Sequence, residues 1–415
     1  MKRAAATAAL ALALAGPAHA GRPCEDKPAT VQQVEQGLRL AEETVAIEVP
    51  GLSLFYGDKQ ALFDVSMNIP KQRVTAFIGP SGCGKTTTLR MLAGLDDASS
   101  GRIHIGERDV THLPPGDRGL SMVFQSYALF PHLSVADNIV FGLRSRKVAK
   151  AERQQRLAQV AELVDLTDYL HRKPAQLSGG QRQRVALARA IISEHPICLM
   201  DEPLSNLDAR LRSDMRREIK ALQSRLDMTV VYVTHDQVEA MSMGDRVILM
   251  QQGHIVQDGT PDELYNQPAS AFAASFIGSP AMNLLPLVAG AQGAVIEGEP
   301  TTPVAPLPAA GGQLGIRPED IELRGASAAG LPGQVESEEY LGADTIAHVS
   351  VGQHTLRVRL GGKHSLTGQP CRLFWSADKA HLFAPSGARR DDLSALELTP
   401  YRTIPRPPTV GSFQH

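Results

Sequence analysis

Four short, mainly apolar runs stand out along the first two thirds of the chain, namely Val74–Ile78, Leu120–Phe124, Ile197–Met200 and Val230–Thr234. Runs of this kind are typical of strands that are buried on both faces, as in a parallel sheet. Between the runs, apolar residues recur at helical spacing, for example at Met215, Ile219 and Leu222. This alternation of buried strands and amphipathic helices predicts an α/β fold.

The segments on either side of these runs have patterns of their own. Ile47–Leu54 and Ala61–Ile69 predict two short strands joined by a turn, and Ser134–His171 is periodic in the manner of helices. A hairpin is expected at Gln251–His254, and a short helical stretch at Glu263–Ile277 closes the first domain.

The composition changes after this domain. Residues 286–313 are rich in Pro, Ala, Gly and Thr, and we expect weak strands joined by a linker there. Short alternating strands follow, most clearly at Thr355–Leu360 and Cys371–Trp375, which predicts a small all-β barrel. The polar end of the chain lacks periodicity and is expected to be disordered. The predicted parts are therefore 1–46, 47–280, 281–384 and 385–415.

The beginning of the chain has the pattern of a secretory signal peptide. Lys2-Arg3 precedes an Ala/Leu run, and Ala18-His19-Ala20 resembles a cleavage site. The four scattered cysteines instead favour a reducing compartment. We therefore interpret residues 1–46 as a signal-like or fused extension, or as a misassigned start. The alternative is a membrane-targeting segment, whose apolar run is shorter than the roughly 20 residues of a spanning helix.

The overall charge gives no sign of a nucleic-acid partner. Lys and Arg number 42 and Asp and Glu number 44, for a formal net charge of -2. Proteins that bind DNA or RNA usually carry a basic surface, because phosphate contacts dominate their affinity. We therefore expect no nucleic acid among the partners of this chain.

The segment after the first apolar run has the spacing of a phosphate-binding loop, G-x-x-x-x-G-K-[ST]. Its glycines allow backbone N–H groups to surround a polyphosphate at the N-terminus of the next helix. The lysine reaches the terminal phosphates, and the threonine hydroxyl can hold Mg²⁺. A chance Gly-rich turn is disfavoured because strand, loop and helix follow in the right order. The predicted nucleotide-binding residues are Gly79, Pro80, Ser81, Gly82, Cys83, Gly84, Lys85, Thr86 and Thr87.

Polar residues follow the other three apolar runs. Asp201 and Glu202 come directly after a buried strand, where Asp201 can hold Mg²⁺ through water and Glu202 can act as general base. Gln125 can sense the metal or the attacking water, or it is a solvated loop amide. His235 ends the last run, and the carboxyl ends of parallel strands meet at one sheet edge. Upstream, Tyr56 either stacks on adenine or lines a turn.

A second anion-binding segment, Leu177-Ser178-Gly179-Gly180-Gln181, precedes a helical pattern. Two glycines and a serine at a helix N-terminus offer N–H groups and a hydroxyl to a phosphate. A chain that binds one nucleotide needs this second segment only if the segment binds the nucleotide of another copy in a dimer. The polar loop Ser205–Asp208 is likewise suited to an interface.

Together these motifs resemble those of the ATP-binding-cassette (ABC) ATPases in their order and approximate spacing, over about residues 47–277. The resemblance implies a phosphate-loop ATPase core with a helical subdomain, and a homodimer that encloses ATP and Mg²⁺ between two copies. It implies catalytic roles for Glu202, His235 and Gln125. It further implies metal contacts from Thr86, Gln125 and Asp201, and ATP contacts from Tyr56, the 79–87 loop, Ser178, Gly179, Gly180, Gln181 and Asp208.

Ile277–Asn283 and Gly315–Glu319 further resemble the ATPases of maltose- and glycerol-3-phosphate-type importers, whose OB-like (TOBE-type) barrel carries regulatory contacts. This implies an energy-coupling subunit at the cytoplasmic face of the inner membrane. Its partners would be two transmembrane permease subunits and, indirectly, a periplasmic solute-binding protein. The expected solute is glycerol-3-phosphate or a related sugar or polyol. The alternatives are import of phosphate, phosphonate or polyamine, or a soluble ABC ATPase without a transport role.

Overall fold

The structure is a computed structural model, and it describes residues 44–393. The expectation of a signal-like start falls almost wholly outside this range, as does most of the expected disordered tail. Three cysteines lie within it, and Cys83, Cys198 and Cys371 are all buried and unpaired.

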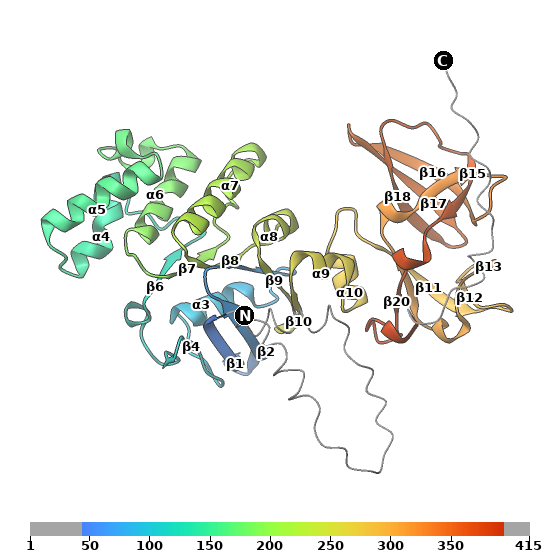
Figure 1. The fold of residues 1–415 in the computed structure, drawn as a ribbon, viewed down its shortest axis with the longest axis horizontal. Coiled ribbons are helices and arrows are strands. Elements are labelled where there is room, and N and C mark those ends of the chain that lie inside the picture. Colours follow the sequence, from blue (N-terminus) through green and yellow to red (C-terminus); the bar gives the residue numbers. More distant parts are fainter. Residues whose placement is uncertain (1–43, 394–415) are drawn as a thin grey trace, which may run out of the picture. The chain divides into compact units, whose positions relative to one another are not determined.

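The central sheet of the first domain has six strands in the order β10-β9-β3-β8-β7-β6 (Figure 1). They are β3 (Val74–Ile78), β6 (Leu120–Val123), β7 (Ile197–Asp201), β8 (Thr229–Val233), β9 (Arg246–Gln251) and β10 (His254–Gly259). All neighbours pair in parallel except β9 and β10, which form the expected hairpin. The four apolar runs are thus adjacent strands of one sheet, and the predicted α/β fold is confirmed.

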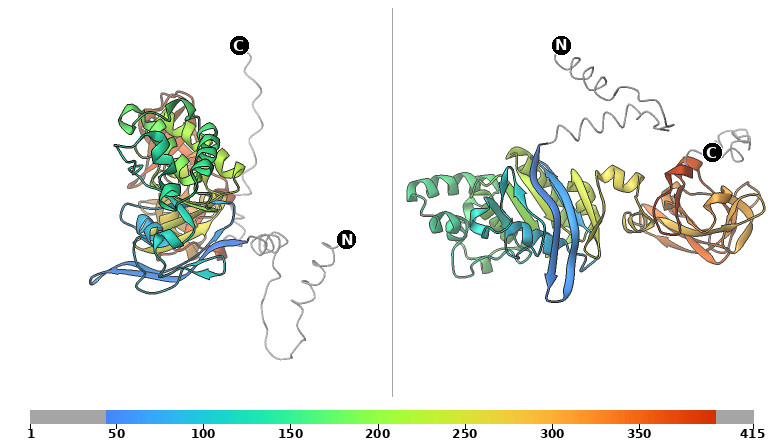
Figure 2. Two further views of the ribbon diagram at one scale, coloured as in Figure 1. Left: turned by 90° about the vertical axis from the view of Figure 1, so that its left-hand side faces the viewer. Right: turned by 90° about the horizontal axis from the view of Figure 1, so that it is seen from below.

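A separate antiparallel sheet is formed by two strands that precede β3 in sequence and two that follow it. Its order is β2-β1-β4-β5, with β1 (Val45–Tyr56), β2 (Lys59–Pro70), β4 (His104–Ile105) and β5 (Arg108–Asp109). Figure 2 shows β1 and β2 (blue) running side by side. Both strands are longer than the sequence predicts, because their pairing continues to Tyr56 and Lys59 at the turn.

The helices of the described chain are α3 (Lys85–Ala93), α4 (Val135–Ser145), α5 (Lys150–Leu163), α6 (Gly179–Ile191), α7 (Ala209–Arg225), α8 (Gln237–Met243), α9 (Pro261–Asn266) and α10 (Ala271–Phe276). Of these, α4, α5 and α6 pack on one another as a helical subdomain (Figure 1). No helix in residues 44–393 has the length and apolar character needed to cross a membrane.

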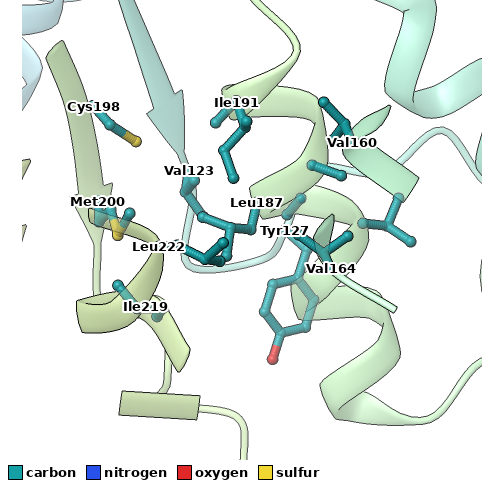
Figure 3. Close-up of a cluster of buried hydrophobic side chains, with 14 of the residues drawn as sticks. Val123, Tyr127, Val160, Val164, Leu187, Ile191, Cys198, Met200, Ile219 and Leu222 are labelled. Atoms are coloured by element: carbon teal, nitrogen blue, oxygen red, sulfur yellow. The ribbon is translucent and has the colours of Figure 1, made fainter. Parts of the chain in front are cut away.

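One hydrophobic cluster joins this helical subdomain to the central sheet. Figure 3 shows its side chains coming from α5, α6 and α7 and from β6 and β7, among them Val123, Val160, Leu187, Met200 and Leu222. Protein cores are close-packed, so a shift of one packed element is felt by the others. The orientation of α6 is therefore tied to the ends of β6 and β7.

The second domain consists of two antiparallel five-stranded sheets, ordered β13-β12-β11-β14-β20 and β15-β19-β16-β17-β18. A single hydrophobic core takes residues from both sheets. The strands are β11 (Asn283–Ala289), β12 (Ala294–Ile296), β13 (Glu299–Ala305), β14 (Gln313–Ile316), β15 (Glu322–Gly325), β16 (Leu331–Tyr340), β17 (Asp344–Val351), β18 (His354–Gly361), β19 (Pro370–Phe374) and β20 (His381–Phe383).

The strands expected in residues 286–313 are present in this domain, and Leu287 and Ile296 point from them into the shared core. The expectation for the end of the chain is wrong in part. Residues 385–393 are not disordered, because they fold back along β20 and bond to the start of α10. The N–H of Ala271 donates to the carbonyl of Gly387 at 2.8 Å. An edge strand such as β20 needs a partner, and this requirement is invisible in the composition of the segment.

Candidate active site

The phosphate-binding loop connects the end of β3 to the start of α3. At Gly79 the φ angle is +153°, and a Cβ atom would lie 2.1 Å from the carbonyl oxygen of Met250. Gly84 precedes α3 with a φ angle of +108°. Only glycine fits both positions without strain, because other residues rarely adopt these conformations. The loop is thereby held against β9, with the N-terminus of α3 at its end.

Lys85, the first residue of α3, is 7% exposed. Its Nζ donates to the carbonyl oxygens of Gly79 at 2.8 Å and Pro80 at 3.1 Å. The ammonium group is thus held against the loop by backbone groups rather than by an acidic side chain. A lysine side chain held in this way is placed to donate charge-assisted hydrogen bonds to the oxygens of a phosphate group.

Asp201 and Thr86 are brought together although they lie far apart in the sequence. The Thr86 hydroxyl donates to Oδ1 of Asp201 at 3.0 Å. Burial raises the pKa of the Asp201 carboxyl group, and the hydrogen bond from Thr86 opposes this shift. Carboxylate and hydroxyl oxygens are ligands that Mg²⁺ accepts, and a divalent cation offsets the cost of a partly buried carboxylate. The two residues therefore fit the predicted metal site.

Glu202 lies at the meeting point of three strand ends. Its Oε2 accepts from Nε2 of Gln125 at 3.0 Å and lies 3.2 Å from Nδ1 of His235. The convergence expected from the sequence is therefore present. The backbone of Glu202 has a φ angle of +43°, which is uncommon for a residue other than glycine and is found at functional sites.

Tyr56 lies at the turn between β1 and β2 and is 54% exposed. Its hydroxyl donates to Asp96 at 3.2 Å, and Asp96 also accepts two bonds from the guanidinium of Arg90. These contacts hold the edge of the ring. The stacking role of Tyr56 stays a prediction.

The second anion-binding segment begins α6. The Ser178 hydroxyl accepts from the N–H of Gln181, and the Gln181 side chain accepts from the N–H of Ser178, so the two form a capping box. A Cβ atom on Gly180 would contact Leu211 of α7 at 3.1 Å. Asp208 caps the start of α7, where its side chain accepts from the N–H of Leu211 at 3.0 Å. Within residues 44–393, no hydrogen bond joins Ser178–Gln181 to the 79–86 loop.

Comparisons with known proteins agree with this geometry. The ABC transporter family model matches residues 62–205, and the TOBE domain model matches residues 314–383. The sn-glycerol-3-phosphate import ATP-binding protein UgpC of Chromohalobacter salexigens is 48% identical over 349 residues, which are 81% of this chain and 94% of that protein. The chain belongs to the ABC transporter ATP-binding proteins. As a member of this family, it is an ATPase that binds ATP and couples its hydrolysis to transport.

Two further proteins support the same assignment. The trehalose/maltose import ATP-binding protein MalK of Thermococcus litoralis is 48% identical to this ABC ATPase over 319 residues, 72% of this chain and 86% of that protein. The structure of cbiO1 from Clostridium perfringens, described as part of the ABC transporter complex cbiONQ, is 28% identical with a TM-score of 0.51. It covers 55% of this chain and 92% of that chain. The predicted fold class and family are confirmed.

Two residues that position the Gln125 loop were missed in the sequence. Arg189 of α6 donates to the carbonyl oxygens of Tyr127 at 2.7 Å and Ala128 at 2.6 Å, where both residues have positive φ angles. Asn206 donates to the carbonyl oxygen of Gln125 at 2.9 Å. One signal for Arg189 was available in the sequence. Arg189 follows Val185 by four residues, so it lies on the apolar face of the predicted helix, where an arginine is unusual.

The side chains that hold the residues on either side of His235 were also missed in the sequence. Glu239 is 3% exposed and accepts from the hydroxyls of Tyr232 at 3.0 Å and Thr234 at 2.7 Å. Arg212 donates to Asp236 at 3.3 Å and to the carbonyl oxygen of Leu207 at 3.1 Å, next to Asp208. In this ABC ATPase, Arg212 therefore connects the loop that precedes α7 to the loop that carries His235.

Proposed function

We propose that this ABC ATPase works as a homodimer in which each ATP is bound by the 79–87 loop of one copy and by Ser178–Gln181 of the other. The observation that carries the proposal is the set of contacts around Glu202. Its carboxylate, next to the Thr86–Asp201 pair, is in contact with both Gln125 and His235. These contacts among the acids at the sheet edge support hydrolysis of a bound nucleotide.

In this proposal each polar group of the sheet edge has one task. Glu202 accepts a proton from the attacking water, and His235 and Gln125 keep its carboxylate and that water in position. Lys85 and the N–H groups of the loop bind the phosphates. Thr86, Asp201 and Gln125 would hold Mg²⁺, which would supply positive charge against the charge that develops on the phosphate oxygens.

The dimer supplies what one copy lacks. The segment Ser178–Gln181 packs against Leu207 and Leu211 and not against the phosphate loop of the same copy. The N–H groups of Gly179 and Gly180 and the Ser178 hydroxyl suit the γ-phosphate of a nucleotide on the partner copy. Asp208, at the start of α7, would then lie at the boundary between the two copies.

Two aromatic side chains that follow Gln125 in the sequence support a docking site for a permease. The rings of Phe130 and Phe141 lie 4.3 Å apart, and Phe141 is 41% exposed. Exposed aromatic residues are common at the centre of protein interfaces. In our proposal two permease subunits bind there, at the cytoplasmic face of the inner membrane, and contact a periplasmic solute-binding protein in turn.

For the solute, we propose sn-glycerol-3-phosphate or a related sugar or polyol, in line with the names of the relatives. Uptake of radiolabelled sn-glycerol-3-phosphate should be lost in cells that lack this chain. It should return with the wild-type chain but not with Glu202→Gln. Unchanged uptake in the deletion strain would overturn the solute assignment. Labelled maltose, phosphate and polyamine, measured in the same strains, test the alternatives.

A further inference from the structure

Gln237 begins α8 only two residues after His235, and its side chain binds a distant piece of backbone. Its Nε2 donates to the carbonyl oxygen of Phe276, and its Oε1 accepts from the N–H of Gly278 at 2.8 Å. Phe276 is the last residue of α10, so both backbone groups lie where a helix leaves its polar groups without helical partners. One amide thus binds the chain on both sides of Ile277 (α8 and α10 in Figure 1).

A residue of the second domain binds the same turn from its other end. Nη1 of Arg317, directly after β14, donates to the carbonyl oxygen of Ile277 at 2.8 Å. Arg317 is only 2% exposed, and its guanidinium lies 3.6 Å from the centre of the Tyr265 ring. We call residues Phe276, Ile277 and Gly278 the 276–278 turn. This turn is therefore bound both by α8, which begins two residues after His235, and by the β domain.

The connection between Gln237 and His235 is short and stiff. Asp236 caps α8 by accepting from the N–H of Val238 at 2.8 Å, and its own N–H donates to the Thr234 hydroxyl at 3.0 Å. His235 therefore lies between Thr234, which follows β8 and binds Glu239 of α8, and Asp236, which caps α8. We expect a displacement of α8 at the 276–278 turn to reach His235.

We propose that Gln237 is a positioning residue for His235, and that the 276–278 turn transmits the position of the β domain to the active site. Movement of the β domain displaces Ile277 through Arg317, and Gln237 passes this displacement to His235 and hence to Glu202. The inference rests on the proposed role of His235 in hydrolysis. A purely structural Gln237 would hold the fold together without changing the chemistry.

The chain offers a matched control for this distinction. Gln257 of β10 makes the same type of contact with neighbouring backbone, donating to Gln267 at 3.1 Å and accepting from the N–H of Ala269 at 2.9 Å. Gln257 lies on β10, away from His235 in sequence, and within residues 44–393 its side-chain hydrogen bonds go to Gln267 and Ala269 rather than to the residues around His235. Replacement of either glutamine by leucine therefore removes two similar bonds, but only Gln237 is connected to His235.

The first experiment compares steady-state ATP hydrolysis by the full chain and its variants. We expect Gln237→Leu to lower kcat about tenfold, because one net hydrogen bond corresponds to roughly that factor, with KM for ATP within about twofold. Gln257→Leu should stay within about twofold of the wild type in both values. Equal losses in the two variants, or no loss in either, would overturn the proposal. Thermal unfolding confirms that both variants are folded.

The second experiment tests the route with double variants. In a His235→Ala background, Gln237→Leu should cause no further loss of kcat, whereas independent losses that multiply would contradict the proposed route. Arg317→Lys should lower kcat, and this loss should disappear when Gln237 is already leucine. If His235→Ala hydrolyses ATP normally, the proposed role of His235 fails. If His235→Ala is impaired but Gln237→Leu is not, only the coupling fails.

Discussion

Replacement of Glu202 by glutamine tests the centre of the proposed mechanism. The substitution keeps the size of the side chain, and its remaining carbonyl oxygen can still accept from Gln125, now 3.0 Å from Oε2. It removes the group that takes a proton from water, because a neutral amide is not a base at neutral pH. The contact with His235 loses its charge-assisted part. The fold and the phosphate loop are left unchanged.

The size of the effect follows from these contacts. A positioned general base contributes roughly a hundredfold to ten-thousandfold to a rate, which is about 3–5 kcal/mol of activation free energy. Glu202 has no place in the phosphate loop, so the affinity for ATP should change by less than about threefold. ATP should therefore remain bound, and the ATP-bound dimer should accumulate.

Three measurements check this outcome. A phosphate-release assay gives kcat, equilibrium dialysis with labelled ATP gives affinity, and sedimentation with ATP and Mg²⁺ gives the fraction of dimer. Glu194→Gln is the control, because Glu194 is an exposed partner of Arg156 outside the site, and it should behave as the wild type. Turnover of Glu202→Gln within about tenfold of the wild type would refute its assignment as the base.

Three other variants test further parts of the structure. Lys85→Ala should weaken ATP binding at least about tenfold, because a charge-assisted bond is lost, and an unchanged affinity in dialysis would contradict the role of Lys85. The pKa of His381 is lowered from 6.5 to about 4, mainly by burial and next by the positive charge of Arg389. The folded state binds this proton less readily than the unfolded state, so the contribution of neutral His381 to the free energy of unfolding is present above pH 6.5 and is lost as the pH falls toward 4. In thermal unfolding, His381→Gln should therefore reduce the loss of stability between pH 6.5 and 4. Asn283→Leu leaves the N–H and carbonyl of Arg357, bonded at 2.8 and 2.9 Å, without partners, and should cost about 2–4 kcal/mol in denaturant unfolding. Equal stability would refute this.

Much of the site is predictable because its chemistry is local in sequence. The phosphate loop binds through consecutive backbone groups, so its spacing is visible without a fold. The apolar runs then indicate a parallel sheet, whose strand ends gather at one edge. The meeting of Gln125, Glu202 and His235 therefore follows from the sequence pattern. The amino-acid sequence thus determined the spacing of the phosphate loop and the sheet edge at which these three side chains meet.

Tertiary structure decided what depends on partners that are distant in sequence. Strands β11–β13 give only a weak strand pattern in the sequence, and their pairing in the order β13-β12-β11-β14 and their place in a shared core are set by the fold. The tasks of Arg189, Asn206 and Gln237 are to bind backbone carbonyls, which every residue type offers equally. A side chain's own identity carries no information about which carbonyl it will meet. The contacts that position the active site, and that connect it to the β domain, therefore emerge only when the chain is folded.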